Sequence, residues 1–502
     1  MRSGEFTIFN PGSRETDDRD AESFYRDLNI DHLIEKMAFK WGRKIRNYYL
    51  SLPCSKEEME YRRGVYADVK KEKVFKALIR YTESLEAVEN LRKEKEKVTI
   101  PVQRAVWHIR EVGEYCSALE NLEHELDNAD LTSEGMKGFL NVLKEALDNG
   151  GYRKLSENTA ELLNEIKKLR FIITYDKDRM AVEIGEIEGN GAYDELIGNR
   201  NKKETTHLKN PFRTDPSISG LEYACLEILS KKKPEFFSRL KEIAEQNEEY
   251  ENPVLKRFDR EISFYLSFYS FQKEMEKEGF VFATPDTTGE KRIEARGLYD
   301  LALALTSIGT DKKIVSNDLF YEKGEKFFVL TGPNQGGKTT FARSLGQLVY
   351  FTMMGLDVPA EYACVPYFPY IRTHFSVEES VETGRGKLME ELTRLAPMMT
   401  DEGSGAFVVI NELFTTAANY DAVIMGKEVL RHFIGLNCMG IYVTHLMELT
   451  EGNEGVVSLR AMLDDRRIQT FRIMRGMADD TACAENQVNK YRLTYEQLKE
   501  RL

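Results

Sequence analysis

The segment Gly332–Thr339 holds the residues with the clearest chemistry in this sequence. It reads Gly-Pro-Asn-Gln-Gly-Gly-Lys-Thr, which has the spacing of a phosphate-binding loop. Its glycines let backbone N–H groups turn toward a phosphate chain, and a following helix N-terminus adds a favourable dipole. In such a loop Lys338 reaches the β- and γ-phosphates, and the Thr339 hydroxyl binds Mg²⁺. The sequence therefore predicts a site for ATP and Mg²⁺.

The elements around the loop fit this interpretation. Phe327–Leu330 is an apolar run of strand length, and Phe341–Tyr350 has a helical pattern. Strand, loop and helix in this order form the context that the motif requires, which makes a chance match in a glycine-rich turn the weaker alternative. Lys338 is also expected to support catalysis, because its cation faces the phosphates. The ATP-binding residues expected here are Gly332, Pro333, Asn334, Gln335, Gly336, Gly337, Lys338, Thr339 and Thr340.

Two later strands end in polar residues. Phe407–Ile410 runs into Asn411 and Glu412, and Gly440–Val443 runs into Thr444 and His445. In open α/β sheets, ligands bind at the carboxyl ends of strands. Asn411 is expected to hold Mg²⁺ together with the loop threonine, although an amide lacks the charge of the usual aspartate. Glu412 is expected to polarise the attacking water, and His445 to contact that water or the γ-phosphate.

Composition sets limits on the kind of protein. A length of 502 residues suggests about three or four domains. A formal charge of −13 argues against a generally basic nucleic-acid wrapper and leaves room for a local basic groove. The lysine-rich stretches Leu91–Lys97 and Asn199–Lys203 are interpreted as solvated faces rather than DNA sites.

The sequence favours a cytoplasmic location. Its cysteines are scattered and form no Cys-x-x-Cys pair, so neither a zinc site nor a disulfide framework is expected, and a reducing compartment fits best. No apolar run approaches the roughly 18 residues that a membrane span needs. Met1–Phe6 lacks the apolar core of a signal peptide. We therefore expect a soluble protein without a membrane partner.

Periodicity predicts that residues 20–170 are nearly all helical. Asp31 is expected to cap one helix, and Thr99 with Pro101 to open another. Gly150 and Gly151 are expected to break the series. The apolar stripe of the first helix is formed by Leu33, Ile34, Met37 and Trp41.

The remaining chain changes character twice. Phe171–Tyr175 and Met180–Ile184 predict two strands joined by a hairpin turn, followed by a polar loop that extends to about Ser217. Asn252 and Pro253 open a long helix that reaches about Glu278. From about residue 290, short apolar strands alternate with helices, which is typical of a parallel sheet. The predicted fold class is therefore α + α/β.

These segments together resemble the MutS family of mismatch-repair ATPases. Thr331–Thr340 is similar to the family sequence Thr-Gly-Pro-Asn-Met-Gly-Gly-Lys-Ser-Thr. Weaker similarity begins at Phe24–Leu33, which resembles the start of the family's core domain. Further segments that resemble family motifs, in the family's order, are Val315–Asp318, Gly355–Ala360, Asn411–Glu412, Tyr420–Asp421 and Thr444–Leu449.

The resemblance implies a multi-helical MutS core and lever followed by an ABC-type P-loop ATPase domain. Expected domains are a tail or expression remnant (1–19), a helical core (20–170), a small clamp-like segment (171–217), lever helices (218–289) and the ATPase domain (290–502). The mismatch-reading N-terminal domains of the family are expected to be absent, so this is interpreted as a short member.

The resemblance also implies a homodimer, since family members bind ATP at a dimer interface. A signature loop from the partner would contact ATP through residues aligned with Thr383, Gly384, Arg385 and Gly386. Gly386 stands where the family usually has serine, which puts this contact in question. DNA is the first expected partner for the clamp. A ribosome or another protein assembly is the alternative, and the acidic balance favours it.

Overall fold

The computed structural model describes residues 6–9, 23–42, 45–168, 171–176, 179–184, 228–287, 292–375, 386–451, 454–466, 468–477 and 499. The chain divides into two compact units. The first contains Asp68–Asp259 with the described residues of Met1–Thr7, and the second contains Ile8–Ala67 and Arg260–Leu502. The expected boundaries at residues 170, 217 and 289 stay predictions. None of the helices in these described ranges is both long and apolar enough to cross a lipid bilayer.

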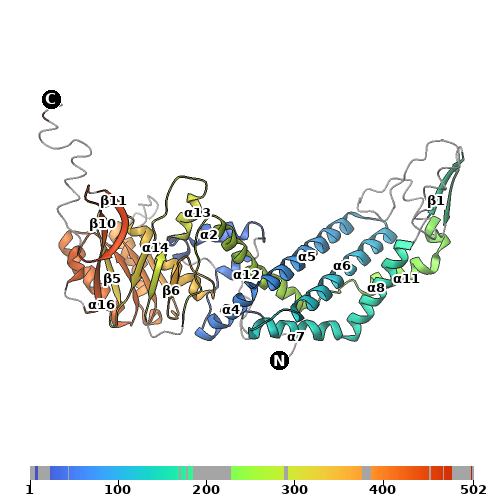
Figure 1. Ribbon diagram of the computed structural model, residues 1–502, viewed down its shortest axis with the longest axis horizontal. Coiled ribbons are helices and arrows are strands. Elements are labelled where there is room, and N and C mark those ends of the chain that lie inside the picture. The colour runs from blue at the N-terminus through green and yellow to red at the C-terminus, as the bar shows by residue number, and fades with distance from the viewer. Residues whose placement is uncertain are drawn as a thin grey trace. The chain divides into compact units, whose positions relative to one another are not determined.

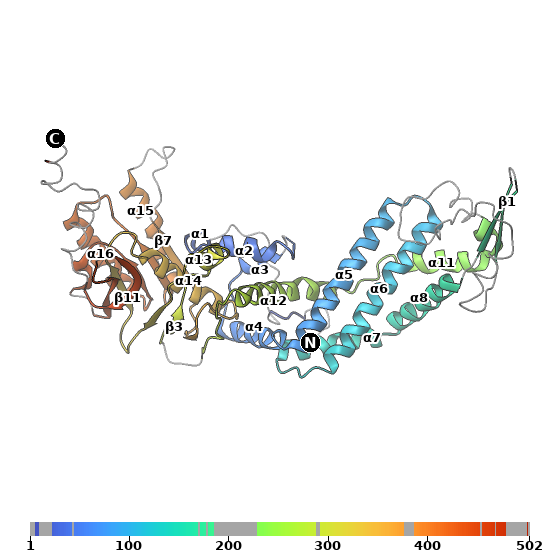
Figure 2. The same ribbon diagram turned by 45° about the horizontal axis from the view of Figure 1, so that its top comes forward.

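The first unit consists mainly of long helices. Helices α5 and α6 run side by side (Figures 1 and 2), and α6 also packs with α8 and α11 around an apolar cluster that includes Ile109, Leu162 and Leu240. Strands β1 and β2 form an antiparallel hairpin in which Phe171 pairs with Ile184, as predicted. The elements are α5 (Glu72–Lys97), α6 (Pro101–Asp127), α7 (Glu134–Asp148), α8 (Gly150–Lys168), β1 (Phe171–Asp176), β2 (Arg179–Ile184) and α11 (Pro234–Gln246); α4 (Lys56–Val69) and α12 (Pro253–Lys277) have residues in both units.

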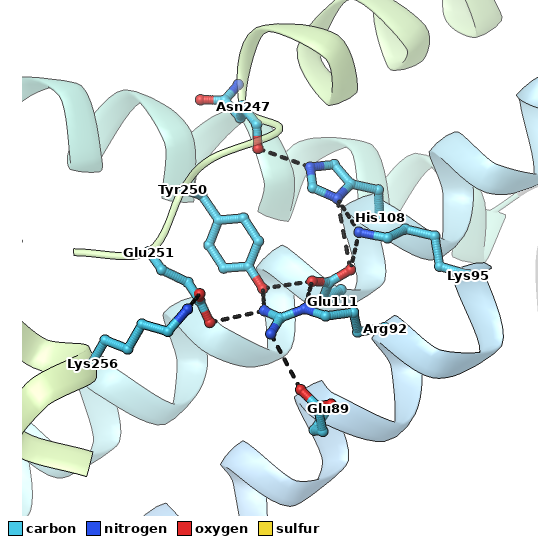
Figure 3. Close-up of polar contacts among 9 residues, drawn as sticks. All are labelled: Glu89, Arg92, Lys95, His108, Glu111, Asn247, Tyr250, Glu251 and Lys256. Carbon is cyan, nitrogen blue, oxygen red and sulfur yellow. Dashed lines mark hydrogen bonds and ion pairs between the residues drawn. The ribbon is translucent and has the colours of Figure 1, made fainter. Parts of the chain in front are cut away.

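A buried network of charges joins α5, α6 and the segment 247–256 within the first unit (Figure 3). Its centre is Glu111, whose side chain is 1% exposed and forms ion pairs with Arg92 and Lys95. Arg92 also binds Glu251 at 2.8 Å. The Tyr250 hydroxyl donates a hydrogen bond of 2.8 Å to Glu111 Oε1. Burial alone raises the pKa of Glu111, but contacts with His108, Lys95, Tyr250 and Arg92 outweigh it and lower the pKa to about 2.

This network corrects one interpretation of the sequence. Lys93, Glu96 and Lys97 are exposed, as expected for a solvated face. Arg92 and Lys95, however, are only 27% and 15% exposed because they turn toward the buried carboxylate. The second lysine-rich stretch, 199–203, lies outside the described residues.

Three predicted helix boundaries are wrong in detail. The N-cap of α2 (Ile30–Ala38) is Asn29, whose left-handed backbone turns the chain, while Asp31 lies inside the first turn. The apolar stripe is buried at Leu33, Ile34 and Met37, but Trp41 lies beyond the helix end. Helix α6 begins at Pro101 with Ile100 as its N-cap, so Thr99 does not cap it.

The break between α7 and α8 falls on Asn149 rather than on Gly150 and Gly151, which belong to α8. The Asn149 side chain accepts a hydrogen bond from Gly151 N, so it satisfies one of the unpaired N–H groups of the new helix. The prediction for α12 was closer: it begins at Pro253, and Asn252 Oδ1 accepts a bond of 2.9 Å from Val254 N.

The second unit contains a six-stranded sheet in the order β11-β10-β5-β9-β8-β7. All neighbours are parallel except β10 and β11. A separate antiparallel sheet has the order β4-β3-β6. The strands are β3 (Glu294–Leu298), β4 (Asn317–Phe320), β5 (Phe327–Thr331), β6 (Tyr362–Cys364), β7 (Ile371–Phe375), β8 (Phe407–Asn411), β9 (Met439–Val443), β10 (Val456–Leu463) and β11 (Gln469–Arg475).

Helices cover both faces of the six-stranded sheet, which is why β5, β8 and β9 are buried at every residue. Helix α14 packs against β8 and β9. On the other face, Phe327, Val408 and Tyr442 share an apolar cluster with residues of α16. The helices of this unit, besides parts of α4 and α12, are α1 (Phe24–Asp27), α2, α3 (Arg46–Tyr49), α13 (Leu301–Ser307), α14 (Lys338–Met353), α15 (Lys387–Leu395), α16 (Asn419–Gly435) and the 3₁₀ turns Ala396–Met399, Asp401–Gly403 and Met447–Thr450.

Candidate nucleotide-binding site

The glycine-rich loop joins β5 to α14, as the sequence predicted. Gly332 and Gly337 have φ angles of 133° and 85°, which residues other than glycine rarely adopt. A Cβ on Gly336 would lie 2.9 Å from Pro333 O, so the tight turn also requires glycine there. Gly337 is the N-cap of α14, which leaves the first N–H groups of the helix without intrahelical partners. This backbone is suited to a phosphate group.

Lys338 is buried and its side chain folds back along the loop. Its ammonium group donates to Gly332 O at 2.8 Å and to Pro333 O at 3.1 Å. Both acceptors are backbone carbonyls rather than carboxylates. These two bonds hold the ammonium group beside the backbone of the loop, where it can face an anion.

Thr339 and Asn411 meet across the start of α14 and the end of β8. The Thr339 hydroxyl donates a hydrogen bond of 3.0 Å to Asn411 Oδ1. Oxygen ligands of this kind suit Mg²⁺, so the pair fits the metal in donor type. Both groups are neutral, and within the described residues no group of three or more His, Cys, Asp or Glu side chains is arranged to hold a metal.

Glu412 and His445 extend from the ends of the neighbouring strands β8 and β9. His445 Nε2 lies 3.4 Å from Glu412 Oε1, and their side chains are 47% and 32% exposed. Glu412 has a left-handed backbone, with φ 55°, and its N–H donates to Val443 O at 2.9 Å. Burial lowers the pKa of His445, and the Lys338 cation adds to this, while Glu412 acts in the opposite direction. His445 is therefore neutral near pH 7 and can donate one hydrogen bond.

A cavity of about 510 Å³ lies beside the loop. Residues 334–340 and Glu412 contribute to its polar side. Strand β11 contributes Phe471, whose backbone has φ 59° and whose ring lies 3.3 Å from where a Cβ on Gly337 would be. The apolar lining comes from Leu298, Leu303, Ile314, Val315 and Phe471.

Three residues that contact the loop or the cavity were not predicted as site residues from the sequence. Gln469 Nε2 donates to Asn334 O at 2.9 Å, which ties β11 to the loop. Asn317 bridges the same strand: its Nδ2 donates to Phe471 O at 3.1 Å, and its Oδ1 accepts from Ile473 N at 2.8 Å. Asn317 lies in the Val315–Asp318 motif and could have been found there. Gln469 and Phe471 carry no local signal, because their partners are more than a hundred residues away in the chain.

The expected partner loop is only partly described. Thr383, Gly384 and Arg385 lie outside the described residues. Gly386 is exposed and is the N-cap of α15. A Cβ at Gly386 would have no atom within 4 Å, so the backbone there has room for the serine that the family usually has.

A buried strand, a glycine-rich loop and a helix, with polar residues at neighbouring strand ends, define the class of α/β nucleotide-binding domains. Residues 328–485 match the family model described as MutS domain V. Over these residues the chain is similar to the MutS family.

Curated relatives give the same result. The chain is 26% identical over 174 residues to the DNA mismatch repair protein MutS of Fervidobacterium nodosum, covering 33% of this chain and 21% of that protein. It is 29% identical over 140 residues to the protein of the same name from Thermotoga maritima, covering 28% and 18%. With the Lactobacillus delbrueckii protein of that name, identity is 24% over 250 residues, covering 49% and 28%. The chain thus matches less than a third of the length of these relatives.

Proposed function

We propose that this protein is an ATPase that hydrolyses ATP at the loop Gly332–Thr340. The observation that carries the proposal is that polar side chains from distant parts of the chain meet at one place. Lys338, Thr339, Asn411, Glu412 and His445 come from three separate segments and lie together at one edge of the sheet. The adjoining cavity has an apolar part suited to a nucleotide base and a polar part suited to phosphates.

Each residue has a distinct role in this proposal. Lys338 and the first N–H groups of α14 bind the β- and γ-phosphates. Glu412 accepts a hydrogen bond from the attacking water and orients it, and neutral His445 donates to a phosphate oxygen. Thr339 and Asn411 hold Mg²⁺, which when bound neutralises charge on the phosphate oxygens.

The direct test compares ATP binding and hydrolysis by the unaltered protein and by Lys338→Ala. Loss of the ammonium group should abolish hydrolysis and weaken binding, because the phosphates lose their cation. Lys323→Ala, which removes an exposed lysine of the same unit, is the matched control and should behave as the unaltered protein. Normal hydrolysis by Lys338→Ala would refute the role of this loop.

We further propose that the ATP cycle opens or closes a clamp on DNA. The named relatives are DNA mismatch repair proteins, and here 20–170 would act as core, 171–217 as a small clamp and 218–289 as lever. Binding should come from phosphate contacts and fall steeply with salt. Mismatched and matched duplexes should bind equally, and a tenfold preference, about 1.4 kcal/mol, would contradict this.

A second candidate is a clamp on a ribosome or another protein assembly. The formal charge of −13 favours it, because a strongly acidic chain repels nucleic acid outside any basic groove. Binding assays with duplex and branched DNA across a salt series, with and without ATP, separate the two candidates. Absence of DNA binding at low salt in both nucleotide states would favour the second.

The proposed site is shared between two copies of the chain. A mixture of Lys338→Ala chains with chains altered at Gly384 and Arg385 would contain one composite site with a sound phosphate loop and a sound partner loop. Activity should therefore partly recover over either variant alone. A strictly monomeric protein with full ATPase activity would exclude a shared site.

A further inference from the structure

Helix α15 contacts the backbone at the ends of β7 and β8 through two polar side chains one turn apart. Glu391 is 4% exposed, and its Oε2 accepts a hydrogen bond of 3.1 Å from Phe414 N. Arg394 NH1 donates a bond of 3.0 Å to Phe375 O. Phe375 is the register partner of Asn411 in the sheet. The helix is therefore tied to the strand ends that carry the candidate magnesium and water-orienting residues.

The backbone held by Glu391 has an unfavourable conformation. Glu412 and Phe414 have φ angles of 55° and 62°, in the left-handed region that residues other than glycine seldom occupy. Such positions are strained and persist only where the surroundings enforce them. Glu412 is fixed by its N–H bond to Val443 O. The corresponding N–H bond at Phe414 goes to the Glu391 carboxylate.

We propose that Glu391 is a positioning residue for Glu412: its carboxylate holds the turn 412–414 and so sets where the Glu412 side chain lies. This inference rests on the proposed ATPase function. A hydrogen bond to a charged group is stronger than one between neutral groups, so it can hold a residue in the left-handed region against its strain. Removing the bond therefore allows the turn to relax, and Glu412 moves with it.

The hydrogen bond is tested first, without nucleotide. Residue-resolved hydrogen–deuterium exchange should show faster exchange of the Phe414 amide in Glu391→Leu than in the unaltered protein. Glu391→Gln keeps a carbonyl oxygen at the same place and should keep Phe414 protected. Thr393→Val, on the exposed face of the same helix, is the control and should change nothing. Unchanged Phe414 exchange in Glu391→Leu would overturn the inference whether or not the protein is an ATPase.

Kinetics then separate positioning from binding. In Glu391→Leu, kcat should fall about tenfold to a hundredfold, as expected for a misplaced catalytic group, while the Kd for ATP changes less than about twofold. Glu391→Gln should restore most of kcat. The inference would be overturned if Glu391→Leu had a normal kcat although its Phe414 amide exchanges rapidly. It would also be overturned if Glu391→Gln had a low kcat although its Phe414 amide stays protected. If Glu391→Leu does not fold, Glu391→Asp takes its place, because the shorter side chain draws the carboxylate away from Phe414 N. Faster Phe414 exchange should then accompany a lower kcat, and a change in neither would overturn the inference. An unaltered protein without any hydrolysis would instead refute the proposed function.

Discussion

Glu111 and Glu412 belong to different units and have opposite surroundings. Glu111 is 1% exposed and lies between Arg92 and Lys95, with the Tyr250 hydroxyl as a further donor (Figure 3). Glu412 is about a third exposed, and its Oε1 lies 3.4 Å from Nε2 of His445. The backbone of Glu111 is helical, whereas that of Glu412 is left-handed.

The difference separates a carboxylate that stabilises the fold from one whose oxygens are accessible to a ligand. The Glu111 oxygens contact two cations and the Tyr250 hydroxyl, so Glu111 fixes α5, α6 and the segment 247–256 and has little capacity for another ligand. Glu412 keeps accessible oxygen surface beside a cavity, at a strand end and on a strained backbone. Strain and incomplete pairing of this kind are typical of functional sites. Removing each charge should therefore affect different properties.

The largest stability effect is expected from Glu111→Gln. Arg92 and Lys95 would lose their buried counter-charge, and breaking such a pair costs about 3–5 kcal/mol in free energy of unfolding. Trp107 lies in the first unit and Trp41 in the second, so a Trp41→Phe background allows fluorescence to follow the first unit alone during denaturant unfolding.

Glu89→Gln is the matched control, because Glu89 pairs with the same Arg92 but is 50% exposed. That substitution should cost less than about 1 kcal/mol. Equal losses for the two variants would mean that burial does not distinguish Glu111, and the comparison would fail.

A second, smaller effect depends on pH and concerns His374 in β7. Burial, with Arg394 as a further cause, lowers the pKa of His374 from 6.5 to about 4. The unfolded chain therefore binds a proton more readily between these values. The stability that neutral His374 contributes is complete above pH 6.5. It is lost as pH falls toward 4, by up to about 1.4 kcal/mol per pH unit. In a Trp107→Phe background, His374→Leu should flatten the pH dependence of unfolding in this window. An identical slope with leucine would contradict the prediction.

The Glu111 carboxylate should respond in a lower pH range. Because its folded pKa is about 2 and its ordinary value is 4.5, its stabilisation is complete above pH 4.5 and is lost as pH falls through 2. Acid should therefore weaken the first unit, whose unfolding is reported by Trp107 fluorescence. This should occur at a lower pH than the loss of the stability that His374 contributes to the second unit. Glu111→Gln should abolish the part of the transition between pH 4.5 and 2, and a transition of unchanged shape would argue against this low pKa.

The smallest effect is expected from Asn411→Asp. A charge beside Thr339 should lower the Mg²⁺ concentration for half-maximal ATPase activity by about threefold to tenfold, because ligand charge sets the affinity of hard cations. The volume of the side chain is nearly unchanged, so the unfolding free energy shows whether the new charge at this buried position disturbs the fold. An unchanged or higher magnesium requirement would show that another group holds the metal.

The elements that carry the candidate site could be predicted from the sequence, because their signals are local. The loop before Lys338, and the strand ends before Glu412 and His445, are each defined by a few consecutive residues, and β5, α14, β8 and β9 formed where expected. The contacts of Asn317 with Phe471 and of Glu391 with Phe414 depend on how distant segments pack. The charged residues at 91–97 were predicted to face solvent. The buried Glu111 that pairs with Arg92 and Lys95 lies on another helix, so the local sequence gives no sign of these pairs.

The most direct test of the account measures ATP binding and single-turnover hydrolysis for Glu412→Gln, with the exposed Glu402→Gln as control. Because the substitution leaves the phosphate loop and Lys338 intact, ATP should bind with a Kd within about threefold of the unaltered protein, while hydrolysis falls about a hundredfold or more. The unfolding free energy of the second unit, read from Trp41, should stay within about 1 kcal/mol. Normal hydrolysis by Glu412→Gln would contradict the role of Glu412 and with it the proposed mechanism.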